Sequence, residues 1–125
     1  MTKAEALQKF WSSFGLPAYE KTAVPTGSDA PAFPYITYEC NFGSFDETIP
    51  LTADLWFRDS KWTAINAKAQ EIAYFIGRGG FTLPCNGGAI WIKRGSPFSQ
   101  HMSDPSDNMI RRIVLNIELE CFTEN

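Results

Sequence analysis

One histidine, three cysteines and scattered carboxylates are the residues of this 125-residue chain that could carry out chemistry. His101, Cys85 and Asp104 supply the side-chain types of a Cys-His-Asp arrangement, in which an imidazole deprotonates a thiol. Their spacing gives it no support, because Cys85 falls in a predicted turn and His101 falls in a separate polar stretch. We therefore predict no catalytic residues and expect that the protein is not an enzyme.

The cysteines also lack the spacing of a metal site. Zinc sites use close ligand pairs such as Cys-x-x-Cys, whereas Cys40, Cys85 and Cys121 lie far apart in the sequence. An odd and widely spaced set is not typical of a secreted disulfide framework. We expect Cys40 and Cys121 to behave as small apolar residues, and we predict neither a metal nor a cofactor.

The run Gly77-Arg78-Gly79-Gly80 has the composition of a phosphate-binding loop. However, it follows a predicted helix, and phosphate is bound at helix N-termini rather than at C-terminal ends. Two basic pairs, Lys93-Arg94 and Arg111-Arg112, could lie side by side and contact phosphate. The net charge of -3 favours a solvated sheet face or salt bridges between subunits for these pairs. It also argues against a general nucleic-acid binder.

Aromatic side chains are abundant, with 10 Phe, 4 Trp and 4 Tyr. Trp56 lies opposite the apolar face of its predicted strand, and Trp91 lies between two isoleucines. A layer of helices can cover only one face of a sheet, so apolar residues on both faces of a strand leave apolar surface exposed. Exposed apolar surface of this kind marks an assembly interface. Phe and Met are enriched at interface cores. Together with the basic pairs, the predicted interface residues are Trp56, Trp91, Lys93, Arg94, Phe98, Met102, Arg111 and Arg112.

These side chains must be positioned by a small α+β fold. Apolar residues that recur every three to four positions predict helices over residues 3–14 and 61–76. Alternation and flanking turn residues predict strands over residues 35–42, 48–58, 81–84, 89–94 and 109–122. The order α-β-β-α-β-β-β predicts a mainly antiparallel sheet of four to five strands, with two helices packed on one face.

The last strand and the two longest loops carry more specific expectations. One face of the strand over 109–122 is predicted to be buried, through Ile113, Leu115, Ile117, Leu119 and Cys121. Pro50 indicates an edge or strand-end position for the strand over 48–58. Residues 15–34 and 95–108 are predicted to be loops, and we expect residues 17–34 and 95–108 to become ordered on contact with partners.

Length and composition fit a single domain over residues 1–125. Hydrophobic residues make up 44% and charged residues 20% of the chain, as expected of a folded protein. The first residues are polar, so no signal peptide is expected. No stretch approaches the roughly 20 apolar residues that span a bilayer. We therefore expect synthesis in the cytoplasm and no membrane partner.

Several segments resemble one known family. Residues 32–38 (AFPYITY) and 51–59 (LTADLWFRD) are similar to the "FPY" and "L-x-x-D-x-W" strand motifs of phage tail-terminator, or tail-completion, proteins. Residues 87–95 and 97–102 resemble the version found in prophages of Gram-positive bacteria, some of which carry the label minor capsid protein. Arg111-Arg112-Ile113 opens the last predicted strand in the same pattern. The resemblance covers most of the chain, as a single tail-terminator-like domain.

The resemblance implies a structural role in the virion tail, after synthesis in the cytoplasm of a bacterial host. Such proteins form a ring, commonly a hexamer, that caps the tail tube, ends its polymerisation and forms the head-joining surface. The implied partners are further copies of this chain, the tail tube protein and a head–tail connector or neck protein. DNA passes through such a ring without specific binding. The family contributes no catalytic, cofactor-binding or metal-binding residue.

Two alternatives stay open. A neck or minor capsid component, which joins head and tail, would share the fold and the ring symmetry without capping the tube. A small ligand-binding module would instead use an exposed Trp56 or Trp91 as a stacking platform for carbohydrate or peptide. For a ring, closure requires a heterologous interface. We expect a sheet edge to supply it, either the strand over 109–122 or the strand that begins near Pro50.

Overall fold

The two helices form where the apolar spacing predicts them in the computed structural model, which describes residues 1–125. Helix α1 (Lys3–Ser12) begins at a capping box, in which Glu5 N donates to Thr2 Oγ1 at 3.1 Å and Thr2 N donates to Glu5 Oε1 at 2.9 Å. Helix α2 (Thr63–Ile76) ends at Gly77, whose φ of +72° lies in the region that glycine adopts without strain. Local sequence signals therefore set the start of α1 and the end of α2.

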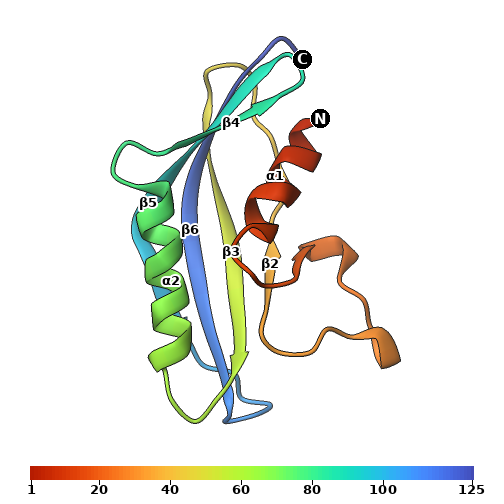
Figure 1. The fold of residues 1–125 in the computed structure, drawn as a ribbon, viewed down its shortest axis with the longest axis vertical. Helices are drawn as coiled ribbons and strands as arrows, with labels where there is room; N and C mark the ends of the chain where they lie inside the picture. Colours follow the sequence, from red (N-terminus) through yellow and green to blue (C-terminus); the bar gives the residue numbers. More distant parts are fainter.

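Six strands form one curled sheet, which is more than the four to five strands predicted (Figure 1). In chain order they are β1 (Ala18–Glu20), β2 (Tyr35–Tyr38), β3 (Thr48–Arg58), β4 (Phe81–Cys85), β5 (Gly88–Met102) and β6 (Ile110–Thr123). Across the sheet the order is β1-β2-β3-β6-β5-β4, and only β1 and β2 pair in parallel. The α+β class is confirmed, with a mixed, mostly antiparallel sheet.

Both helices cover the same face of the sheet, which we call the inner face (Figure 1). The core consists of buried residues from α1, α2 and the inner face of the strands. It includes the alternate residues of β6 that the sequence predicts, namely Ile113, Leu115, Ile117, Leu119 and Cys121. The prediction of a strand with one buried face is therefore confirmed for β6.

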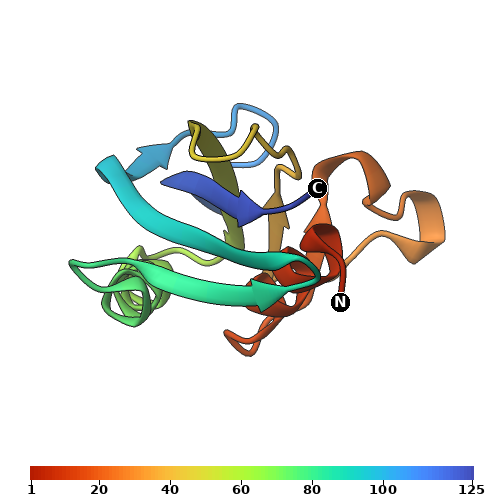
Figure 2. The ribbon, with the colours of Figure 1, turned by 90° about the horizontal axis from the view of Figure 1, so that it is seen from above.

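Helix α1 closes the open side of the curled sheet, between the edge strands β1 and β4 (Figure 2). Gln8 Nε2 donates to the carbonyl oxygen of Ala18 in β1 at 3.0 Å. On the other side, the ring of Phe10 lies 5.9 Å from the ring of Phe81 in β4. The N-terminal helix thus joins the two strands that lie furthest apart in the sheet order.

The predicted loop over 95–108 is wrong in its first half. Strand β5 continues to Met102 and pairs with β6 again after an irregularity that follows Arg94. At this irregularity Gly95 lies so close to β6 that a Cβ would be 3.0 Å from the carbonyl oxygen of Asn116. A glycine and a proline interrupt the alternation here, so the pattern that predicts a strand is lost although the backbone stays extended.

The predicted loop over 15–34 also contains regular structure. It holds β1 and two short 3-10 helices, Lys21–Ala23 and Gly27–Asp29. Three residues of β1 pair with β2, and a segment so short has no recognisable period. The order of elements is therefore α-β-β-β-α-β-β-β, with one more strand before the second helix than predicted.

The strands that we expected to supply a free edge lie inside the sheet. Strand β6 is paired with β3 on one side and β5 on the other, so its prediction as an edge is wrong. Strand β3 lies between β2 and β6, but its first residues, Thr48–Leu51, extend beyond the residues that pair with β2. Pro50 falls in this segment, so its strand-end position is confirmed.

Candidate functional site

The face of the sheet opposite to the helices, which we call the outer face, carries five of the eight predicted interface residues. The register places Trp56 beside Arg112, and Met102 beside Arg112 on its other side. Trp91 and Lys93 lie further along β5, on the same face. The outer face is therefore where a candidate site is best sought.

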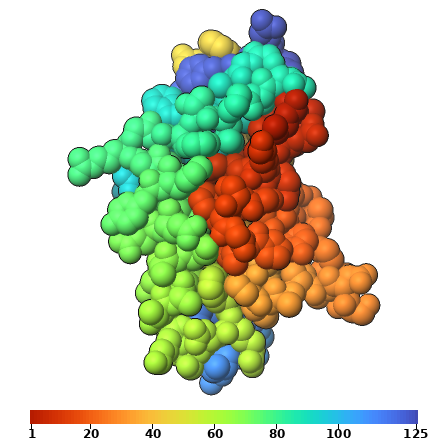
Figure 3. Space-filling view, in the orientation of Figure 1, coloured from red at the N-terminus to blue at the C-terminus, as the bar shows by residue number.

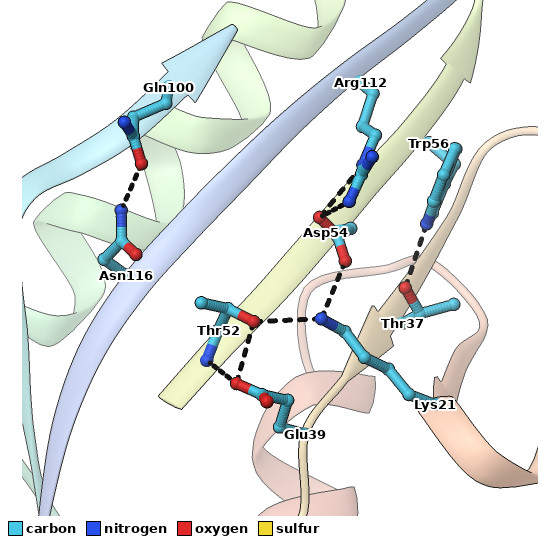
Figure 4. Close-up of polar contacts among 9 residues, drawn as sticks. All are labelled: Lys21, Thr37, Glu39, Thr52, Asp54, Trp56, Gln100, Arg112 and Asn116. Atoms are coloured by element: carbon cyan, nitrogen blue, oxygen red, sulfur yellow. Dashed lines mark hydrogen bonds and ion pairs between the residues drawn. The ribbon is translucent and has the colours of Figure 1, made fainter. Parts of the chain in front are cut away.

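A buried carboxylate, Asp54, is the centre of this face (Figure 4). Asp54 is only 2% exposed, although it points away from the core. Its Oδ1 accepts from Nη2 and Nε of Arg112, at 3.1 and 3.2 Å, and its Oδ2 lies 3.1 Å from Nζ of Lys21. A buried charge is tolerated only when it is paired in this way. The three residues therefore form one charged unit.

Sequence reasoning placed Asp54 on the polar face of its strand but did not single it out. The available signal was an acidic residue between two apolar ones, Ala53 and Leu55, in a strand rich in apolar residues. Its partner Lys21 comes from the segment predicted to be a loop, and Arg112 comes from a distant strand. Only the fold brings these three charges together.

Three side chains stand in a row across β2, β3 and β6 beside this carboxylate. The rings of Tyr35 and Trp56 stack at 6.1 Å between centroids, with planes inclined by 14°. The guanidinium of Arg112 lies 4.8 Å from the centre of the Trp56 ring, and Trp56 Nε1 donates to Thr37 Oγ1 at 2.9 Å. Trp56 thus has partners on neighbouring strands and a satisfied indole N–H.

A second layer of hydrogen bonds ties the early segment of the chain to the sheet (Figure 4). Lys21 Nζ donates to Thr52 Oγ1 at 2.9 Å, and Thr52 Oγ1 donates to Glu39 Oε1 at 2.8 Å. Beside these bonds lies an open hollow lined by Lys21, Val24, Tyr35, Thr37, Asp54, Trp56 and Arg112. Two cations and two carboxylates balance in this network, so it serves to fix the segment around Lys21 to the outer face.

The other end of the outer face has a separate ion pair. Lys93 Nζ lies 2.6 Å from Glu120 Oε1 and 4.5 Å from the centre of the Trp91 ring. Hydrogen bonds from Lys93 and from Thr48 lower the pKa of the Glu120 carboxyl group below its usual value. Trp91 Nε1 donates to the carbonyl oxygen of Gly79 at 2.9 Å. The indole of Trp91 therefore also has a polar partner within the chain.

The two basic pairs do not lie side by side as we expected. Arg94 is opposite Ile117 in the register, whereas Arg112 is opposite Met102, near the other end of β5. The guanidinium of Arg111 donates to backbone carbonyls, including that of Asn108 at 2.7 Å. Alternation puts the two members of each pair on opposite faces. No continuous basic patch forms from these four residues.

The histidine and the cysteine that could have formed a nucleophilic pair lie at opposite ends of β5. His101 is opposite Ile113 in the register, and Cys85 is opposite Gly88. The imidazole of His101 stacks on Trp62, with 3.9 Å between ring centroids and planes inclined by 5°. No group of three or more His, Cys, Asp or Glu side chains is placed to hold a metal ion.

Two predicted interface residues, Phe98 and Met102, lie along the second half of β5. Phe98 packs partly against the core, and Met102 is 39% exposed at the end of the strand. None of the helices is long and apolar enough to cross a membrane. No family model, no curated protein and no solved structure matches this chain.

Proposed function

We propose that this chain is a structural virion protein that forms a ring at the head-proximal end of a phage tail tube. In this role it ends tube polymerisation and forms the head-joining surface. The observation that carries the proposal is the uncovered half of β5. Strand β4 pairs with β5 only as far as Ile92, so the segment from Arg94 to Met102 has β6 on one side and no strand on the other. Such an edge pairs readily with a neighbouring chain.

The two ends of the sheet differ in a way that suits a terminator, which must match the tube on one side only. At one end, Phe45 in the loop between β2 and β3 is 68% exposed. At the other end, hydrogen bonds from Ser106 to Asp104, and from Met109 and Arg58 to Asp107, lower the pKa of both carboxyl groups. One end thus carries an exposed aromatic ring, and the other carries hydrogen-bonded carboxyl groups, of which Asp107 is paired with Arg58, so a ring of these subunits has two unlike faces.

The direct test is the length of the tail tube. Purified protein is added to polymerising tube protein, and tubes are measured by electron microscopy. We expect shorter, capped tubes, and we expect overlong tubes in a phage that lacks the gene. Tails of normal length without heads would favour the neck or minor capsid alternative. Normal virions in the deletion phage would contradict both roles.

The ligand-binding alternative has less support from the side-chain geometry. The indole N–H groups of Trp56 and Trp91 both donate within the chain, and both rings have cationic neighbours, Arg112 and Lys93. A stacking platform needs a free ring face. A titration with oligosaccharides, followed by tryptophan fluorescence, checks this alternative, because a saturable change would favour it over the ring.

A further inference from the structure

The charges of this chain are sorted between the two sides of the sheet. Residues 77–102, which span β4, β5 and the loop before them, contain three cations and no Asp or Glu: Arg78, Lys93 and Arg94. Residues 18–39, which span β1 and β2, contain one lysine and three carboxylates: Glu20, Asp29 and Glu39. We call these two segments the basic edge and the acidic edge.

The strand order places these segments at opposite sides of the molecule. β1 and β2 stand at one end of the order and β5 and β4 at the other. The loop between α2 and β4 protrudes on one side, and the segment over 21–34 protrudes on the opposite side (Figure 1 and Figure 3). A copy of the chain placed beside another in the same orientation therefore brings a basic edge against an acidic edge.

Most of these charges have no ion-pair partner within the chain. Lys93 pairs with Glu120, and Lys21 pairs with Asp54. Arg78 and Arg94 form no ion pair, and neither do Glu20 and Asp29 on the acidic edge. Glu39 belongs to the balanced network around Lys21 and Asp54. Both edges thus hold uncompensated charge of opposite sign, which attracts over distances of about 10 Å at moderate salt.

An exposed aromatic ring accompanies each edge. Tyr74, near the end of α2 and four positions before Arg78, is 73% exposed. On the acidic edge, Phe33 is 37% exposed and lies in the same protruding segment as Asp29. Aromatic residues and arginine are the types enriched in protein–protein interfaces. The composition of both edges therefore suits a contact between proteins.

We propose that the basic edge of one copy binds the acidic edge of a second copy, head to tail. This inference rests on the proposed ring, because it names the two surfaces that meet in it. Pairing like edges, as in a two-fold dimer, would bring charges of the same sign together and is disfavoured. Each copy that binds through one edge keeps the other edge free, so the contact repeats until the ring closes.

Charge reversal tests this interface in the full chain. One variant reverses the basic edge (Arg78→Glu with Arg94→Glu), and another reverses the acidic edge (Glu20→Lys with Asp29→Lys). The control, Lys9→Glu with Lys61→Glu, makes the same change in net charge as the basic-edge variant, at two lysines outside both edges that form no ion pair. Self-association is measured by sedimentation velocity at low and at high salt, and folding is checked by circular dichroism.

We expect the wild type and the control to associate, more weakly at high salt. Each reversed variant should associate at least about tenfold more weakly. A mixture of the two reversed variants should associate again, because each reversed edge then meets an edge of opposite sign. Recovery in the mixture also shows that both variants are folded.

Two outcomes overturn the interface. A wild type that stays monomeric at every concentration and salt contradicts it, and so do reversed variants that associate as strongly as the wild type. The tube-length assay separates this failure from failure of the proposed function. If the wild type caps tubes but the reversed variants still associate, the terminator role stands and the proposed edges are refuted. If association depends on both edges but the protein has no effect on tubes, the interface stands and the terminator role is refuted.

Discussion

Arg112 binds Asp54 through two nitrogens, with Nε at 3.2 Å and Nη2 at 3.1 Å from the same carboxylate oxygen. The carboxylate is buried, whereas the side chains of Arg112 and Lys21 are about one third exposed, at 31% and 34%. The two sides of this contact are therefore unequal. Loss of a cation leaves negative charge in the sheet, while loss of the carboxylate leaves cations that can still reach water.

Replacing Arg112 is expected to cost more than replacing a cation in a surface pair. Arg112→Leu leaves Asp54 with Lys21 alone, and we expect a loss of about 3 kcal/mol in the free energy of unfolding. The matched control is Arg58→Leu, because Arg58 Nε binds Asp107 at 3.0 Å in an exposed pair, which contributes about 1 kcal/mol or less. Urea denaturation measures both. Equal losses would show that Asp54 does not depend on Arg112.

Stability should fall in alkaline solution through Tyr38. Burial raises the pKa of Tyr38 from 10.0 to about 12, with smaller contributions from the nearby Cys40 and Glu20. Its hydroxyl also donates to Gln8 in α1. Because the unfolded chain releases this proton at lower pH than the folded chain, the contribution of Tyr38 is constant below pH 10 and is lost between about pH 10 and 12.

Denaturation at several pH values checks this contribution. Tyr38→Phe should show a smaller alkaline loss of stability than the wild type, since no phenol is left at this position. The control is Tyr74→Phe, which changes an exposed tyrosine. An unchanged alkaline slope in Tyr38→Phe would contradict the role of this phenol.

Gly88 is expected to tolerate no side chain. Its φ is +152°, and a Cβ would lie 1.9 Å from the carbonyl oxygen of Phe122 in β6. Gly88→Ala must therefore move the start of β5 away from β6, at a cost of about 3 kcal/mol or more. Gly79→Ala is the control, because a Cβ there meets nothing within 4 Å. Thermal unfolding should separate the two variants clearly, and similar melting temperatures would refute the close approach.

The cysteines should differ in reactivity toward thiol reagents. Cys121 is 1% exposed, and burial raises the pKa of its thiol, which lowers the reactive thiolate fraction. Burial and Glu20 also raise the pKa of Cys40. We expect Cys85 to be modified first by Ellman's reagent and Cys121 to react only as the chain unfolds. In Cys121→Ser the slowest phase should disappear, and rapid modification of Cys121 in the folded protein would contradict its burial.

The sequence predicts those elements whose patterns are regular and whose ends carry local signals. The period of α1 and α2 and the alternation of β6 extend over ten or more residues, so each is recognised without knowledge of the fold. β1 is too short to show a period, and in β5 the irregularity after Arg94 breaks the alternation. The predicted ends of a strand are wrong where pairing with a neighbouring strand, rather than an alternating sequence pattern, keeps the backbone extended.

Prediction of the candidate site on the outer face from the sequence is limited in the same way. The sequence gives reasons to expect an interface through Trp56 and Arg112, but no local pattern shows that both contact one buried carboxylate. Asp54, Lys21 and Arg112 come from three different elements, and cross-strand register decides that they meet. Sequence reasoning therefore finds the types of residue involved and misses their arrangement.

The position of β6 has a consequence for biosynthesis. It lies in the middle of the sheet, between β3 and β5, yet it is the last strand in the chain. On the ribosome, β2 with β3 and β4 with β5 can pair as separate hairpins, but no strand joins them until residues 110–123 have emerged. The sheet is thus completed in one late step dominated by long-range contacts, which is a slow kind of folding. Nascent chains that lack β6 consequently cannot hold the two hairpins in one sheet.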